Sequence, residues 1–164
     1  MDAEVIRYSN ADTGEDLALL RILKSNFIRG DTKFFLKNSI PPVTTELCHV
    51  GSLLGQFGAN SFTSGRMSQI GRVLSNEKVF DQTTVTAFPG SSGGGVFVEK
   101  GENKGLYIGM LVRGAGETFN LIVPVRRMRV WAARVGVSFA LDPSIKPPSS
   151  IAKLKARPIE DVGR

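Results

Sequence analysis

The chain has 164 residues, of which 41% are hydrophobic and 22% charged, a composition typical of one globular domain with its own core. No apolar run approaches the roughly 18–20 residues of a membrane-spanning helix, so no membrane span is expected. The opening residues, MDAEVIRYSNADTGED, lack the basic and apolar regions of a secretory signal.

The formal net charge of +6 predicts attraction to polyanions. The excess lies partly in one arginine-rich segment and partly in the last residues (Arg126, Arg127, Arg129, Arg134, Lys146, Lys153 and Lys155). Nucleic-acid binding would need aromatic side chains among these charges, and only Trp131 lies there. A solvated basic face is therefore favoured, and nucleic acid is not an expected partner.

The single cysteine, Cys48, excludes an internal disulfide, which is compatible with a cytoplasmic or virion-associated protein.

Short β-type runs separated by turn residues follow one another along most of the chain. The segment 16–23 is apolar and fits a strand or a helix on periodicity alone. The expected strands are 3–9, 33–38, 50–58, 64–73, 83–88, 95–100, 106–112 and 119–125. Their regular spacing predicts an all-β fold, an antiparallel barrel or sandwich rather than alternating βα units.

The pattern changes after residue 125, where apolar residues recur at helical spacing. Met128, Trp131, Ala132 and Val135 form one face of a short helix, and Gly136 is placed to end it. The remaining segment, 138–164, is rich in Pro, Ser and Lys and predicts an extended or disordered basic tail.

The stretch TAFPGSSGGGVF, residues 86–97, places a Gly/Ser run between two expected strands. By residue type alone it fits a linker or structural turn, or a turn that holds a nucleophilic serine. Glycines let consecutive backbone N–H groups point to one spot, which is the arrangement of an oxyanion hole. The run also fits G-x-S-x-G, but a strand follows instead of a helix and no histidine follows Ser92, so the α/β-hydrolase interpretation fails.

The run GSSGGG resembles the nucleophile motif of trypsin-like (chymotrypsin-fold) serine proteases, G-[D/N/S]-S-G-G-[P/G]. GEDLALLRI is similar to the aspartate segment of that family, and VGSLLGQFG and TSGRMSQIGR are similar to the first strands of the second barrel in HtrA-type members. GLYIGMLVRG, FNLIVPV and the Trp131 helix match the family's later elements in order. The resemblance covers about residues 3–136.

This resemblance implies a set of site residues. Ser92 would be the nucleophile, Asp16 would orient a catalytic histidine, and the N–H groups of Gly90 and Ser92 would form the oxyanion hole. The substrate backbone would pair with the strand edge at Val112, Arg113 and Gly114.

Thr86 and Asn120 would lie near the base of the primary specificity pocket. Neither is charged, so a small or uncharged residue at the cleavage site is expected rather than Lys or Arg. The resemblance implies no cofactor and no metal.

The catalytic histidine is not at its expected place, because in this family it precedes the aspartate and no histidine precedes Asp16. The sole histidine, His49, has neighbours that indicate a structural or surface role.

The part of the chain that matches the family is also shorter than a double barrel, which needs about 200 residues. This length predicts a complete second barrel and a partial first barrel. The expected domains are 1–40 (remaining first-barrel strands), 41–125 (second barrel), 126–137 (helix) and 138–164 (tail).

The resulting prediction is a serine endopeptidase that hydrolyses peptide bonds through an acyl-enzyme on Ser92, with the histidine outside this chain. Three explanations stay open: a fragment whose missing piece carries the histidine, a partner polypeptide that completes the first barrel, or a catalytically inactive trypsin-fold module of assembly or virion type. Because a triad without its base loses several orders of magnitude in rate, the chain alone is predicted to be inactive or very weak.

Overall fold

The computed structural model describes residues 2–26, 30–74, 77–114 and 118–162, and it divides into two compact units. One unit comprises Thr32–Arg127, and the other combines Met1–Asp31 with Met128–Arg164. The described chain is mostly β-strand with few helices, which confirms the predicted all-β class. Neither of its α-helices has the length and hydropathy needed to cross a bilayer, within the described residues.

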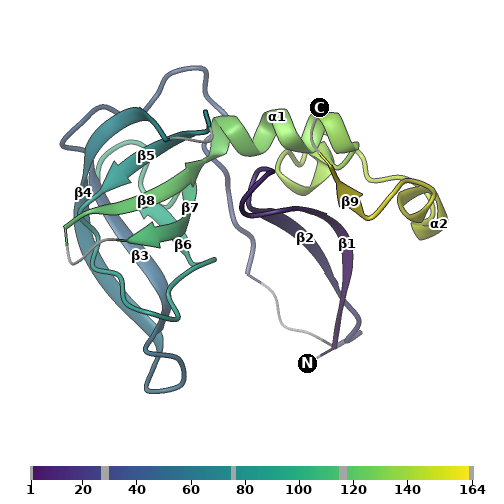
Figure 1. Cartoon of the computed structure of the whole chain (residues 1–164), viewed down its shortest axis with the longest axis horizontal. Helices are drawn as coiled ribbons and strands as arrows, with labels where there is room; N and C mark the ends of the chain where they lie inside the picture. Colours follow the sequence, from purple (N-terminus) through teal and green to yellow (C-terminus); the bar gives the residue numbers. More distant parts are fainter. Residues whose placement is uncertain (1, 27–29, 75–76, 115–117, 163–164) are drawn as a thin grey trace. The chain divides into compact units, whose positions relative to one another are not determined.

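The Thr32–Arg127 unit is a closed six-stranded barrel (Figure 1). All of its strand pairs are antiparallel, in the order β3-β4-β5-β8-β7-β6, with β6 closing onto β3. The strands are β3 Glu46–Leu53, β4 Gly58–Val73, β5 Val79–Thr83, β6 Gly95–Val98, β7 Tyr107–Gly114 and β8 Asn120–Pro124. Closure leaves no strand edge open, so each strand is held from both sides.

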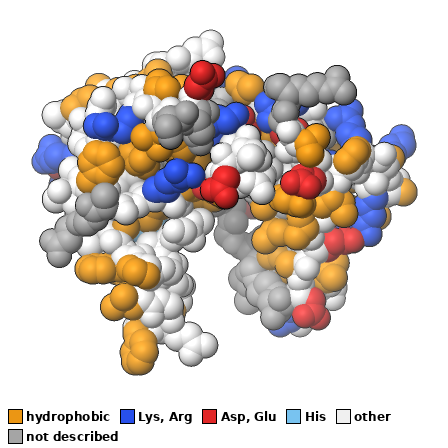
Figure 2. All heavy atoms as spheres, in the orientation of Figure 1, with side chains coloured by type: hydrophobic (Ala, Val, Ile, Leu, Met, Phe, Trp, Pro, Cys, Tyr) orange, Lys and Arg blue, Asp and Glu red, His pale blue; other side chains and the backbone are white. Residues whose placement is uncertain are grey.

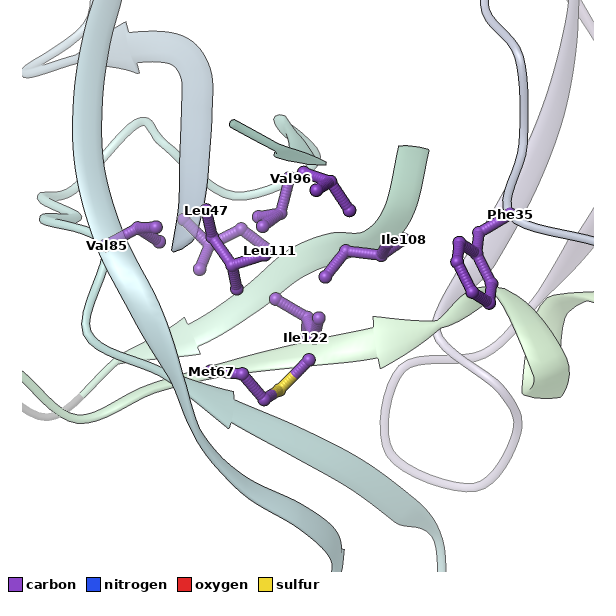
Figure 3. Close-up of a cluster of buried hydrophobic side chains, with 9 residues drawn as sticks. Phe35, Leu47, Met67, Val85, Val96, Ile108, Leu111 and Ile122 are labelled. Carbon is purple, nitrogen blue, oxygen red and sulfur yellow. The ribbon is translucent and has the colours of Figure 1, made fainter. Parts of the chain in front are cut away.

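Inward-facing apolar side chains fill the barrel, as Figure 3 shows. Leu47, Val96 and Ile122 are fully buried, because successive side chains of a strand point to opposite faces and the inner ones meet across the barrel. Val85, which follows β5, is fully buried in the same cluster. Burial of each large apolar side chain contributes about 1.5–3 kcal/mol, so this cluster is the main source of stability of the unit.

A buried carboxylate links the barrel to the start of α1, Val125–Val135. Asp81 on β5 accepts two hydrogen bonds from the Arg126 guanidinium, both at 2.6 Å, and a third from the Gly71 N–H at 2.9 Å. This bidentate pairing offsets the cost of burying the Asp81 charge and holds Arg126 against β5 within the barrel unit.

The other unit contains a three-stranded sheet in the order β2-β1-β9. β1, Ala3–Ser9, pairs antiparallel with β2, Leu17–Ile22, and parallel with the two-residue β9, Glu160–Asp161. Val5 pairs with Leu20, and both side chains are exposed. Hydrophobic side chains are correspondingly visible on the surface over β1 and β2, and over the β3–β4 hairpin of the barrel (Figure 2).

The segment 138–162 is more regular than the predicted extended or disordered tail. It contains a 3₁₀ turn at Ser138–Ala140, helix α2 at Ile151–Lys155 and strand β9. The Tyr8 N–H donates to the Ile159 carbonyl at 2.9 Å, and the tail's Lys155 pairs with Glu4 at 2.5 Å. Pairing with β1 supplies backbone partners that composition alone does not indicate.

The helix prediction agrees with α1, whose Met128, Trp131, Ala132 and Val135 are buried. Gly136 follows it with a φ of 76°, the left-handed conformation that ends helices.

Several strand boundaries differ from those expected from the sequence. The segment 33–38 forms only an isolated bridge from Phe34 to Tyr107, and 83–88 is mostly loop because β5 ends at Thr83. The segment 50–58 contains the β3–β4 turn instead of one strand.

Candidate functional site

The segment from Phe88 to Gly94 is a hydrogen-bonded turn rather than a linker. The Ser91 N–H donates to the Phe88 carbonyl at 2.9 Å, and the Gly94 N–H donates to the Ser91 carbonyl at 3.0 Å. The buried Ser91 hydroxyl accepts the Phe88 N–H at 3.1 Å, so its side chain closes the turn from inside.

Two neighbouring elements hold this turn in place. On β7, Leu111 accepts the Gly93 N–H at 2.7 Å and donates its own N–H to the Gly94 carbonyl at 3.0 Å. At the β3–β4 turn, the Leu54 N–H donates to the Pro89 carbonyl at 2.9 Å. Gly90 has a φ of 94°, and a Cβ there would lie 2.7 Å from the Ser52 carbonyl oxygen. Only glycine fits this contact and this φ.

Ser92 is exposed at the surface of this turn. Its hydroxyl is 3.5 Å from the Val112 carbonyl, at the limit of a hydrogen bond, so it is weakly held. Among the described residues, the N–H groups of Gly90 and Ser92 donate to no protein acceptor. The site therefore offers an accessible hydroxyl and two uncommitted amide donors within three residues of chain.

A pocket of about 340 Å³ lies beside Ser92. It is mostly apolar, and its walls come from the turn and from β7 (Ala87, Phe88, Pro89, Ser91, Ser92, Leu111, Val112, Arg113 and Gly114). Within the described residues its only charged lining group is Arg113, whose guanidinium carbon is 5.9 Å from the centre of the Phe80 ring. The structure thus brings Val112, Arg113 and Gly114 to the same pocket as Ser92.

Thr86 and Asn120 are not among the described residues that line this pocket. The fully buried Asn120 side chain donates to the Val85 carbonyl at 2.7 Å, and the Thr86 carbonyl accepts the Thr63 hydroxyl at 3.0 Å. Asn120 nevertheless lies against the pocket wall, because a Cβ on Gly114 would be 2.3 Å from its Oδ1.

His49 is fully buried on β3, on the same strand face as the core residue Leu47. Its Nδ1 is 3.1 Å from the Gly95 carbonyl oxygen. Burial lowers the pKa of His49, and the hydrogen bond to Gly95 opposes part of this shift. No hydrogen bond joins His49 to Ser92 in the described structure, so His49 is not placed as its base. The inward alternation of Leu47 and His49 was the sequence signal for this burial.

Asp16 belongs to the other unit, so its surroundings are described separately from those of Ser92. It is half-buried at the end of a tight loop before β2, with a φ of 56°, and its N–H donates to the Asn10 carbonyl at 3.3 Å. Within the described residues its carboxylate has no hydrogen-bond or ion-pair partner, whereas the adjacent buried Glu15 lies 3.6 Å from Arg134.

Comparison with known proteins gives one family and a set of similar structures. Residues 1–106 match the trypsin-like peptidase domain. Among solved structures, an HtrA-type protease, a variant of AlgW with a tripeptide, is similar with a TM-score of 0.64 and 19% identity. The match covers 85% of this chain and 44% of that chain, so this chain spans less than half the length of its structural neighbour. No curated protein matches the sequence.

Proposed function

Because the chain belongs to the trypsin-like peptidase domain family, we propose that it is the nucleophile-bearing part of a serine endopeptidase. The observation that carries this proposal is the geometry of the Phe88–Gly94 turn. An exposed Ser92 hydroxyl lies beside a mostly apolar pocket, next to two N–H groups that have no acceptor in the described chain. That combination supplies the nucleophile and the oxyanion donors that acyl transfer to a serine requires, apart from the base.

In the proposed reaction, the Ser92 oxygen bonds to the substrate carbonyl carbon while its proton passes to a base. The Gly90 and Ser92 N–H groups donate to the oxyanion that forms. Cleavage of the C–N bond then releases the amine, which takes the proton from the base, and leaves an ester on Ser92. Water then attacks the ester carbonyl and gives one proton to the same base, which passes it to the Ser92 oxygen as the ester bond breaks. The new carboxylic acid leaves and loses its proton to solvent.

The base is proposed to be a histidine from a polypeptide segment outside residues 1–164. The sole histidine of the sequence, His49, is buried and bonded to Gly95 instead. The half-buried Asp16 carboxylate, which has no partner in the described chain, would orient that histidine. Its role rests on the family resemblance, since Asp16 and Ser92 belong to separate units.

The substrate is proposed to be a peptide or protein segment that runs along β7 at Val112–Gly114. The pocket beside Ser92 has no acidic lining residue among those described, which argues against selection of Lys or Arg. Its largely apolar walls favour a small or uncharged side chain. The proposal that Thr86 and Asn120 lie near the base of this pocket rests on the family resemblance. The structural neighbour was solved with a tripeptide, which supports the peptide class.

A fluorophosphonate probe tests the proposal, because such probes react with serines whose hydroxyl is activated by a base. The full chain should label slowly alone and at least about a hundredfold faster with a histidine-bearing completing segment present. Ser92→Ala should remove the labelling, and Ser64→Ala, an exposed serine on β4, should not. Labelling that persists in Ser92→Ala removes Ser92 from the mechanism.

A partner polypeptide that completes the β2-β1-β9 sheet is proposed as the source of that segment. β2 pairs only with β1 in the described chain, and Val5, Leu20 and Ile22 expose apolar surface. An open edge and an apolar face favour strand addition. The same features favour the rival function, an inactive trypsin-fold assembly module. Association without any Ser92 labelling would select that rival.

A further inference from the structure

The buried His49 has no role in the proposed reaction as nucleophile or base, yet its ring lies directly against the turn that carries Ser92. Its side chain is fully buried, and Nδ1 is 3.1 Å from the carbonyl oxygen of Gly95, three residues after Ser92. A buried aliphatic side chain would fill the same space without any polar atom to satisfy. The ring therefore contributes something beyond apolar packing.

The hydrogen bond defines the tautomer of the ring. Since a carbonyl oxygen can only accept, Nδ1 must carry the proton and donate it to Gly95. Nε2 is then an acceptor, and it is buried without a hydrogen-bond partner in the described chain. An unsatisfied buried nitrogen carries an energetic cost, which the bond from Nδ1 to Gly95 offsets in part.

The ring also limits the backbone on two sides. A Cβ on Gly94 would lie 2.2 Å from His49 Cε1, and a Cβ on Gly51 would lie 2.6 Å from His49 Nε2. Gly94 is at the same time bonded to Leu111 through its carbonyl and to Ser91 through its N–H. The Ser92 turn is therefore clamped between β7 on one side and the His49 ring of β3 on the other.

We infer that His49 is a positioning residue, whose imidazole donates to Gly95 and holds the Gly93–Gly95 backbone so that the hydroxyl and N–H of Ser92 keep their catalytic geometry. This inference rests on the proposed role of Ser92. It assigns the histidine of this chain a function distinct from proton transfer, because it acts through the turn and does not touch the reacting atoms.

Two substitutions separate the hydrogen bond from the packing of the ring. His49→Phe retains a ring and loses the donor, whereas His49→Asn retains a donor near the position of Nδ1 and loses the ring. The readout is the rate of fluorophosphonate labelling of the full chain with its completing segment, measured on fully folded protein. His49→Phe should lower this rate about five- to tenfold, the effect of one lost hydrogen bond, and His49→Asn should restore part of it.

Val98→Ala is the matched control, since Val98 is buried on β6 of the same barrel, its backbone bonds to Leu106 and Gly105, and it is not among the residues that line the pocket beside Ser92. It should lower the melting temperature and leave the labelling rate of the folded protein unchanged. Equal labelling rates for His49→Phe and Val98→Ala would overturn the inference, because His49 would then contribute stability alone.

A second cycle uses Gly51, where the three atoms nearest to an added Cβ all belong to His49. Gly51→Ala should push the ring out of place and slow labelling in the wild-type background. It should have no further effect in His49→Ala, where the clash is absent. Additive effects of the two substitutions would contradict a route through the ring.

Amide hydrogen exchange distinguishes failure of this inference from failure of the proposed function. In the isolated chain, His49→Phe should speed exchange at the Gly93 and Gly94 N–H groups, and Val98→Ala should not. If His49→Phe speeds amide exchange but Ser92 is not labelled in any context, the positioning role of His49 stands and the peptidase proposal is rejected. If His49→Phe leaves amide exchange unchanged, the inference that His49 holds the Gly93–Gly95 backbone is rejected, whatever the labelling result.

Discussion

The two units of the molecule hold their strands in different ways. In the barrel every strand pairs on both sides, and the inner side chains form a continuous apolar cluster. In the β2-β1-β9 sheet, β2 pairs only with β1 in the described chain, and Val5 and Leu20 are exposed. The proposed nucleophile and its two amide donors lie on the barrel, where the frame is closed. Groups that must be fixed to within about half an ångström belong on such a rigid frame.

The test with the largest expected change in stability truncates one leucine in each unit. Leu47 on β3 is 0% exposed and Leu20 on β2 is 55% exposed. Leu47→Ala should destabilise the barrel by about 2–5 kcal/mol, because it leaves a cavity in the core. Leu20→Ala should change stability by about 0.5 kcal/mol or less. Urea unfolding followed by amide exchange measures both, and similar losses would contradict the contrast between a packed barrel and an open sheet.

The second test removes the charge of Asp81, which pairs with Arg126 inside the barrel unit. Asp81→Asn should cost about 2–3 kcal/mol, less than a fully buried pair because the Arg126 side chain is 33% exposed. Its control is Glu46→Gln, which breaks the exposed pairs with Arg66 and Lys100 and should cost about 1 kcal/mol or less. Thermal unfolding compares the two variants. Equal losses of unfolding free energy in the two variants would show that burial of the Asp81–Arg126 pair does not increase its contribution to stability.

The third test concerns the turn itself. Gly90 and Gly101 both have positive φ values, 94° and 82°, but only a Cβ on Gly90 meets backbone atoms, at 2.7 and 2.8 Å. Gly101→Ala should therefore cost about 1 kcal/mol from backbone strain alone. Gly90→Ala should cost about 1–2 kcal/mol more and should also abolish labelling of Ser92, since the first amide donor moves. Normal labelling of Gly90→Ala would argue against an oxyanion role for this amide.

The smallest expected effect is a pH dependence confined to the barrel, which holds the chain's single histidine. Burial lowers the pKa of His49 below its ordinary value of 6.5, so the unfolded chain binds a proton first as the pH falls. Barrel stability should be full above pH 6.5 and decline below it, by at most about 1.4 kcal/mol per pH unit. His49→Phe should remove this component in urea titrations between pH 7 and 5. An unchanged profile would exclude His49 as its source.

Local patterns in the sequence were sufficient for the class of fold and for the family. The spacing of β-type runs predicted an antiparallel barrel or sandwich, the family resemblance specified a barrel, and the closed six-stranded barrel confirms it. The order of GEDLALLRI, GSSGGG and the later strands predicted membership of the trypsin-like family, and the domain match over residues 1–106 confirms the family. The α1 helix was predictable because an apolar face at helical spacing is a local property of the chain.

Strand ends were less predictable, because pairing depends on partners distant in the sequence. β5 ends at Thr83, although TTVTAF reads as a strand, because the Thr84 N–H donates to Arg66 and Val85 turns into the core. β9 exists only because β1 provides an edge for it. The residues near position 160 do not by themselves predict a strand that pairs with β1.

The sequence by itself determined the barrel class, the family and the glycine-rich character of the Ser92 turn, since these depend on periodicity and residue type. Only the tertiary structure decided that Leu111 and the β3–β4 turn clasp this turn, that a pocket opens beside Ser92, and that His49 lies buried against Gly94 and Gly95. The physical reason is that these contacts join residues separated by up to 46 positions, through barrel closure that no local pattern encodes.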